Sequence, residues 1–257
     1  MHLEFFGAAG EVTGSCHILT VAKRTVLLDC GLIQGGRSPD KRNREDFPFD
    51  AAGIDAVVLS HAHIDHCGRL PLLRKRGFRG PIFATAASRD IARILLADSA
   101  NLAQRDAERI NRKRARNGDE RRLEPLYTEE EAQATMKQFR VVPYGKAFEV
   151  LPGIELRYRD AGHILGSASV WLKLREGTLE RQLVFSGDLG QYDSPILRDP
   201  ELGKEPVDLV LMESTYGARQ HREREDTLRE FGEVLRHAST DGGNVLIPAF
   251  AVGRSQE

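Results

Sequence analysis

The segment His61-Ala62-His63-Ile64-Asp65-His66 places four potential metal ligands within six residues. It follows directly on the apolar run AVVLS at positions 56–60, which is typical of a buried strand. Imidazole and carboxylate groups are suitable zinc donors, with bond lengths of about 2.0–2.2 Å. Four polar residues that only capped a helix would leave several desolvated groups without partners. We therefore predict that the strand end curls these side chains around a metal ion.

Two later segments offer further ligands, because one cluster cannot complete the coordination of two metal ions. His163 stands in the segment AGHILGS at 161–167, and Asp188 stands in SGDLG at 186–190. Each follows a predicted strand, and the glycines allow a close backbone approach. Alone, His163 could be an ordinary loop histidine and Asp188 an ordinary turn aspartate. Beside the cluster at 61–66, we expect both to be ligands.

The remaining pattern predicts an α/β protein of sheets layered with helices. Alternating or compact apolar runs predict strands at 3–6, 17–21, 25–29, 56–60, 81–85, 154–158, 169–174, 182–186, 208–213 and 244–248. Helical spacing predicts helices at 71–76, from 87 to 96 and at 226–237. Residues 98–140 are charge-dense and mostly helical in pattern, so we expect a helical insertion there.

Composition excludes a global attraction to polyanions. The chain of 257 residues has 40% hydrophobic and 29% charged residues and a net charge of −1, so any nucleic-acid site must be local. The densest basic run is Arg112-Lys113-Arg114-Ala115-Arg116. It could touch a polyanion, but such a run is more often a solvated helix face, and we favour the solvated face.

Cysteine usage and the absence of long apolar segments favour a soluble, cytoplasmic protein. Cys16, Cys30 and Cys67 are scattered and odd in number, which is typical of a reducing compartment. The first residues show no signal-peptide pattern, and no stretch approaches the roughly 18 apolar residues of a membrane span. Cys67 lies beside His66, and we expect a loop thiol there rather than a ligand.

The order of these motifs resembles the metallo-β-lactamase superfamily: Asp29 in LDCG, then the cluster at 61–66, then a histidine and an aspartate after later strands. The resemblance implies a four-layer αββα sandwich with two zinc ions. In the family pattern the first zinc is held by His61, His63 and His163. Asp65 and His66 hold the second zinc, and Asp188 bridges the two.

Two positions refine this resemblance. The diiron oxidoreductases of the superfamily carry a glutamate where this chain has His63, so the resemblance favours zinc-dependent hydrolysis. Asp29 is implied to orient a ligand imidazole, although an ordinary strand-end aspartate is the alternative. Two zinc ions suit the hydrolysis of phosphodiesters, lactams, thioesters and lactones alike. The ligands therefore indicate a reaction class and leave the substrate open.

The region after Asp188 favours one substrate. The segments LMESTYG at 211–217 and GNVLIPAFAVGR at 243–254 resemble the β-CASP branch of nucleic-acid nucleases. The opening GAAGEVTGS at 7–15 is similar to the polyadenylation-factor group of that branch. Glu213 matches the acidic residue of the first extra motif of the branch, which would position a histidine acting as general acid.

The resemblance also sets the expected domain boundaries. We expect a metallo-β-lactamase domain at 1–217 and the start of a β-CASP domain at 218–257. The sequence stops within what resembles the opening turn of a helix, so we expect it to be truncated. The general-acid histidine and the last ligand of the second zinc would then lie beyond residue 257, leaving the second site incomplete. Such a chain should bind zinc less tightly and cleave RNA poorly.

Substrate contacts are weakly indicated. Ser214 and Thr215 could bind phosphate and Tyr216 could stack on a base, but turn chemistry and core packing explain them equally well. Arg254 could meet a phosphate at a helix start, although we favour a solvent-facing arginine.

Three functions remain open. The leading interpretation is an RNA phosphodiesterase, endo- or exonucleolytic, acting on single strands. The second is a small-molecule hydrolase of the glyoxalase II or lactonase kind, which shares the zinc ligands. The third is a non-catalytic scaffold subunit of an RNA-processing complex. DNA stays an alternative substrate, and a homodimer is one oligomeric state that the sequence allows.

Overall fold

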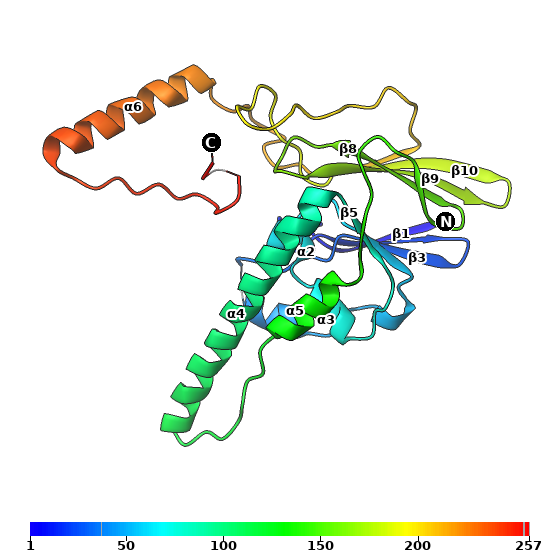
Figure 1. The fold of residues 1–257 in the computed structure, drawn as a ribbon, viewed down its shortest axis with the longest axis horizontal. Helices are drawn as coiled ribbons and strands as arrows, with labels where there is room; N and C mark the ends of the chain where they lie inside the picture. Colours follow the sequence, from blue (N-terminus) through cyan, green and yellow to red (C-terminus); the bar gives the residue numbers. More distant parts are fainter. Residues whose placement is uncertain (37, 254, 257) are drawn as a thin grey trace. The chain divides into compact units, whose positions relative to one another are not determined.

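The computed structural model describes all residues except 37, 254 and 257, so the expectation for Arg254 lies outside the described residues. The described chain divides into two compact units, Met1–Glu213 and Ser214–Glu257. The first unit contains two β-sheets and most of the helices (Figure 1).

The first sheet has six strands in chain order. It is antiparallel through its first three strands and parallel through the rest. The strands are β1 (His2–Gly7), β2 (Cys16–Val21), β3 (Arg24–Leu28), β4 (Ala56–Val58), β5 (Ile82–Ala84) and β6 (Phe139–Val141). The sharp turn at Ala22 and Lys23, both with positive φ, joins β2 to β3.

The second sheet has five strands, antiparallel except for its last pair. They are β7 (Phe148–Leu151), β8 (Ile154–Asp160), β9 (Ala168–Glu176), β10 (Leu179–Phe185) and β11 (Leu209–Leu211). The spatial order is β11-β10-β9-β8-β7.

Apolar side chains along the strands point alternately to the two faces of the first sheet, and they contribute to a hydrophobic core on each face. In β3, Val26 and Leu28 join the cluster shared with the second sheet, whereas Leu27 faces the helices. The helical side is covered by α3 (Leu70–Lys75), α4 (Ala86–Arg116) and α5 (Glu129–Met136) (Figure 1). The order of layers in this unit is helix, sheet, sheet, which agrees with the two packed sheets and one of the two helical layers of the predicted αββα sandwich.

The predicted strands of this unit are present, with ends shifted by at most three residues. The sequence did not predict β6, β7, α1 (Pro39–Arg44), the 3₁₀ turn η1 (Ala51–Gly53) or α2 (Ile64–Cys67). Within the region 98–140, α4 is continuous from Ala86, and β6 belongs to the first sheet. The helix ends before Asn117 and Gly118, where Gly118 has φ 74°.

The second unit contains the amphipathic helix α6 (Arg224–Asp241), which ends at Gly242 in the left-handed conformation (φ 68°). The predicted strand at 244–248 is wrong: these residues have no regular secondary structure. A strand needs a neighbouring strand for its hydrogen bonds, and the described residues of this unit form none. Across the described chain, no helix combines the length and apolar character required to cross a membrane.

Candidate metal centre

The histidine-rich segment forms a tight turn between β4 and the four-residue helix α2. His63 is the residue before α2, and His66 and Cys67 lie within it. Gly31 makes this geometry possible, because a Cβ atom there would lie 1.5 Å from the Asp65 carbonyl oxygen. The glycine of the LDCG motif therefore lets the chain after β3 pack against the turn.

His163 and Asp188 reach the same place from loops after β8 and β10. The two loops are joined by a hydrogen bond from the Gly190 amide to the Ala161 carbonyl, at 2.8 Å. A Cβ atom at Gly190 would lie 1.7 Å from the Gly162 carbonyl oxygen. The glycine after Asp188 is thus required for the two ligand-bearing loops to touch.

Four donor atoms form one half of the cluster, which we call the four-donor side: His61, His63, His163 and Asp188, all within 4.8 Å of one another. His63 Nδ1 lies 3.0 Å from His61 Nε2 and 3.0 Å from His163 Nε2. Asp188 Oδ2 lies 3.8 Å from His61 Nε2 and 3.5 Å from His163 Nε2. Tetrahedral zinc with bonds of about 2.0–2.1 Å requires donor separations of about 3.3 Å. The donors therefore suit one zinc ion.

The other oxygen of Asp188 faces a second group, which we call the three-donor side. Asp188 Oδ1 lies 3.2 Å from His66 Nε2, and Asp65 Oδ2 lies 3.9 Å from the same nitrogen. One carboxylate thus presents an oxygen to each side. This arrangement can hold two cations close together.

Asp29 is fully buried behind the cluster, in the left-handed conformation (φ 57°). Its Oδ2 lies 2.7 Å from His66 Nδ1 and accepts hydrogen bonds from the hydroxyls of Ser60 (2.8 Å) and Ser15 (3.1 Å). Because an ionised carboxylate only accepts, His66 Nδ1 donates to Asp29, and His66 Nε2 is turned toward Asp188 and Asp65. Ser60 Oγ also lies 3.0 Å from His61 Nδ1, which leaves His61 Nε2 turned toward the four-donor side.

Burial keeps the imidazoles of the four-donor side neutral. Desolvation lowers the pKa of His61 well below its ordinary value, lowers that of His63, and lowers that of His163 to about 4. The neighbouring imidazoles add to this effect. Neutral imidazole is the form that binds metal, so this side is prepared for a cation at neutral pH.

The three-donor side has the opposite protonation. Burial opposes the charge on His66, but Asp29 and Asp188 outweigh it and raise the pKa of His66 well above its ordinary value. Burial alone would raise the pKa of Asp188, but the hydrogen bond from His66 and the charges of the surrounding histidines together lower it. Burial raises the pKa of Asp65.

Glu213 lies beside this cluster, at the end of the first unit. Its Oε1 accepts a hydrogen bond from the Leu189 amide at 2.6 Å, and its own amide donates to Ser186 Oγ at 3.1 Å. It therefore clamps the loop that carries Asp188 at both ends.

The substrate residues suggested by the sequence belong to the second unit. Ser214, Thr215 and Tyr216 open that unit, and the Tyr216 ring stacks on His221 (centroids 4.0 Å apart) and under Arg219 (4.5 Å). The ring contacts of Tyr216 thus lie within its own unit.

Cys67 lies at the end of α2 rather than in a loop. Its thiol is buried and donates to the Ala62 carbonyl, at 3.2 Å, and burial raises its pKa. No sequence pattern pointed to Ser15 and Ser60, because a serine near a strand end is common and only the fold brings these two into contact with Asp29.

Comparison with known proteins adds an independent finding. Residues 24–241 match the family described as the Beta-lactamase superfamily domain. Ribonuclease TTHA0252 of Thermus thermophilus is 42% identical over 257 residues, which are 100% of this chain and 53% of that protein. Transcription termination factor FttA of Cenarchaeum symbiosum is 37% identical, over 99% of this chain and 38% of that protein. Cleavage and polyadenylation specificity factor 73 of Drosophila melanogaster is 30% identical, over 100% of this chain and 35% of that protein. The chain thus spans about half the length, or less, of these curated relatives.

Proposed function

Because the chain belongs to the metallo-β-lactamase superfamily, in its β-CASP branch, we propose that it binds two zinc ions and hydrolyses phosphodiester bonds of single-stranded RNA. The observation that carries the proposal is Asp188, whose two oxygens face two separate groups of donors. The names of the relatives support RNA over a small molecule, since they refer to a ribonuclease, transcription termination and cleavage with polyadenylation.

The donor set supports the following roles. His61, His63 and His163 would hold one ion, Asp65 and His66 the other, and Asp188 would bridge them. Such a pair lowers the pKa of water and stabilises charge on attacking and leaving oxygens.

Three further roles fall to side chains of this chain: two of them position metal ligands, and one accepts a proton. Asp29 fixes the ring of His66 through the 2.7 Å bond, and Glu213 fixes the loop of Asp188. Asp65 is one-fifth exposed, so its carboxylate lies at the open edge of the cluster, where it would accept a proton from the attacking water. The three buried free cysteines, Cys16, Cys30 and Cys67, support a cytoplasmic location.

The test measures zinc per chain by mass spectrometry and cleavage of end-labelled single-stranded RNA. We expect RNA products and two zinc ions, the second bound more weakly because only Asp65, His66 and Asp188 face it. Asp188→Ala should lose both ions and at least about a thousandfold in rate, because several kcal/mol of charge stabilisation disappear. Asp90→Ala, an exposed aspartate on α4, is the matched control and should leave both readouts unchanged.

Parallel substrates separate the alternatives. Hydrolysis of a glutathione thioester or a lactone in place of RNA would favour the small-molecule hydrolase, and equal cleavage of single-stranded DNA would widen the substrate class. Binding of RNA with two zinc ions and no cleavage would favour the scaffold subunit. The length distribution of the products would distinguish an exonuclease from an endonuclease.

A further inference from the structure

The far end of α4 has a shape that the core does not explain. The buried residues of this helix recur every four positions as Ser88, Ala92, Leu96 and Ala100, and the last buried one is Ala107. The helix nevertheless continues to Arg116, and the chain then returns beside it toward α5 (Figure 1). The residues after 107 therefore extend the helix without contributing to the hydrophobic core.

This extension is ordered by a specific clamp. The Asn111 side chain accepts a hydrogen bond from the Leu123 amide (2.7 Å) and donates one to the Leu123 carbonyl (2.9 Å). Arg114 also donates to the Arg121 carbonyl, at 3.4 Å. We call residues 111–122 the basic tip. The clamp holds two basic segments, one on the helix and one on the returning chain, next to each other.

The charge of the basic tip differs from that of the chain. It contains six Arg or Lys and two Asp or Glu residues, a net charge of +4 against −1 for the whole sequence. Asp119 is paired with Arg121 at 2.8 Å. The side chains of Arg112, Lys113, Arg116 and Arg122 are exposed and form no ion pair within the described residues.

The helix dipole explains only part of this clustering. Cations in the last turn, such as Lys113 and Arg116, stabilise a helix C-terminus. That effect does not extend to Arg121 and Arg122 on the returning chain, where each additional like charge is repelled. The concentration of unpaired cations requires a different explanation.

The residue types indicate which partner suits the tip. Ala115 is the only apolar residue between 111 and 122. A protein interface has a desolvated apolar or aromatic core, and a membrane-surface helix needs an apolar face. The basic tip has neither an apolar core nor an apolar face. Five of the six basic residues are arginines, whose planar guanidinium binds phosphate through paired hydrogen bonds.

The same helix is attached to the metal centre at its other end. Thr85 Oγ1 and Ser88 Oγ both donate to the Gly166 carbonyl, at 2.7 and 2.8 Å, in the loop that carries His163. A helix of 31 residues is on the order of 45 Å long. The basic tip is thus held at a fixed distance from the ligands, along one rigid element.

We propose that the basic tip binds the phosphate backbone of single-stranded RNA that extends away from the metal centre. This rests on the proposed function, because it assigns a second contact to the same substrate. The contact strengthens the binding of long RNA and contributes nothing to an RNA too short to reach the tip.

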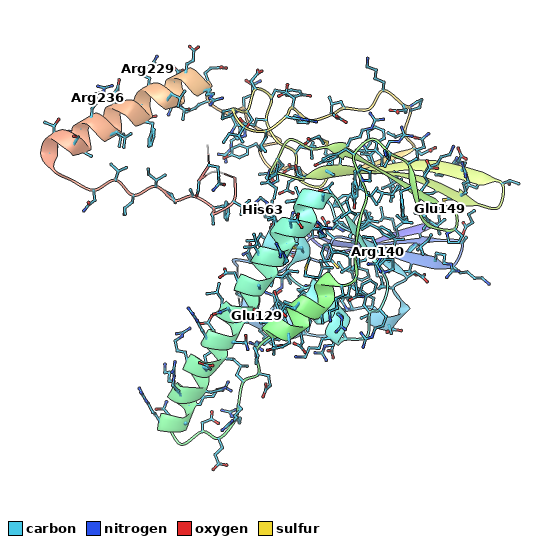
Figure 2. All side chains as sticks on the ribbon, in the orientation of Figure 1. His63, Glu129, Arg140, Glu149, Arg229 and Arg236 are labelled. Atoms are coloured by element: carbon cyan, nitrogen blue, oxygen red, sulfur yellow. The ribbon has the colours of Figure 1, made fainter. Side chains whose placement is uncertain are left out.

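The test compares two variants with equal charge change. The tip variant carries Arg112→Gln, Lys113→Gln, Arg116→Gln and Arg122→Gln. The control variant neutralises four exposed basic residues elsewhere in the first unit, Lys23, Lys137, Arg140 (Figure 2) and Lys146, again to Gln. Fluorescence anisotropy with an uncleavable phosphorothioate RNA of about 30 nucleotides and one of about six measures affinity from about 50 to 200 mM salt. Thermal melting verifies that both variants fold.

We expect the tip variant to bind the long RNA at least about tenfold more weakly. The slope of log affinity against log salt should also be reduced by about 3, because four phosphate contacts are lost and each contributes about 0.7 on a single strand. Its binding of the short phosphorothioate RNA, and its cleavage of an unmodified RNA of the same length, should equal those of the unmodified protein. An unchanged affinity and slope, or an equal loss in the control variant, would overturn the proposal.

A double variant, Arg112→Gln with Lys113→Gln, should show about half the slope change. If the unmodified protein cleaves RNA of neither length, the proposed function fails, while anisotropy still decides whether the tip binds RNA.

Discussion

The two sides of the metal centre share Asp188 but differ in how their donors are prepared. The four-donor side can satisfy a tetrahedral ion with protein groups alone, whereas the three-donor side leaves a coordination position open. Closed sites are typical of structural metals, and open sites are typical of catalytic ones. With the proposed pair of zinc ions bound, this asymmetry predicts that the ion on the four-donor side mainly holds the loops together and that the ion on the three-donor side exchanges more easily.

The histidines of the two sides also differ in their protonation. Burial keeps His61 and His163 neutral, with the pKa of His163 at about 4. His66 instead has a raised pKa, because Asp29 and Asp188 outweigh burial. A cation entering the three-donor side must displace a proton, and one entering the four-donor side need not.

The largest effects on zinc content and rate are expected from variants that remove one donor from one side only. His63→Ala removes a donor from the four-donor side and His66→Ala removes one from the three-donor side, so each should retain about one zinc and lose about a thousandfold or more in rate. Zinc analysis after incubation with a chelator should show that the ion left in His66→Ala is the more resistant. His2→Ala, an exposed histidine, is the control. Loss of both ions from both variants would show that the sides do not bind independently.

A smaller effect is expected behind the three-donor side. Asp29→Asn keeps the shape but removes the charge that holds the His66 ring, so affinity for the second zinc should fall about 10- to 100-fold. The first zinc should be retained. Ser15→Ala removes only a 3.1 Å hydrogen bond to Asp29 and should cause a weaker version of the same loss. Competitive zinc titration measures both, and an equal loss at the two sides would contradict the orienting role.

The candidate ligands could be picked out from the sequence because each stands in a short motif after a predicted strand, and the structure brings their donor atoms together. The separation between His63 and His163, 100 positions in the chain, did not hide them, since strand ends gather at one edge of the layered sheets. The sequence could not supply the contacts of Ser60 with Asp29 and His61. They depend on the backbone turn after β4, which no side-chain pattern specifies.

The failures of the sequence interpretation also have a physical cause. The short strands β6 and β7 lie in a charged region without clear alternation, and pairing with β5 and β8 makes them strands. Residues 244–248 have the apolar composition of a strand, yet Leu246 is 92% exposed and unpaired with any described strand. Tertiary pairing, rather than local preference, decides such segments.

Acidification should remove the second zinc first. Because the pKa of His66 is raised in the folded protein, its protonated form is stabilised at low pH, and that stabilisation is lost as the pH rises through the folded pKa. Zinc therefore competes with a proton, and affinity at the three-donor side should fall by about tenfold per pH unit below that pKa. The four-donor side should hold zinc to lower pH, since the pKa of His163 is about 4. Zinc titrations from about pH 8 to pH 5 test this order. Parallel loss of both ions would contradict it.

The smallest effect is a loss of zinc affinity that should be equal on the two sides. Glu213 accepts from the Leu189 amide at 2.6 Å and so holds the loop of the shared ligand Asp188. In Glu213→Gln an amide oxygen can still accept that bond, but the charge assistance is lost, at about 1–2 kcal/mol. We therefore expect affinity for both ions to fall together by roughly five- to thirtyfold, with their ratio unchanged. The same titrations measure this ratio, and Glu205→Gln, an exposed glutamate, is the control. A loss confined to one side would mean that Glu213 acts on a single metal ion and not through the bridging carboxylate.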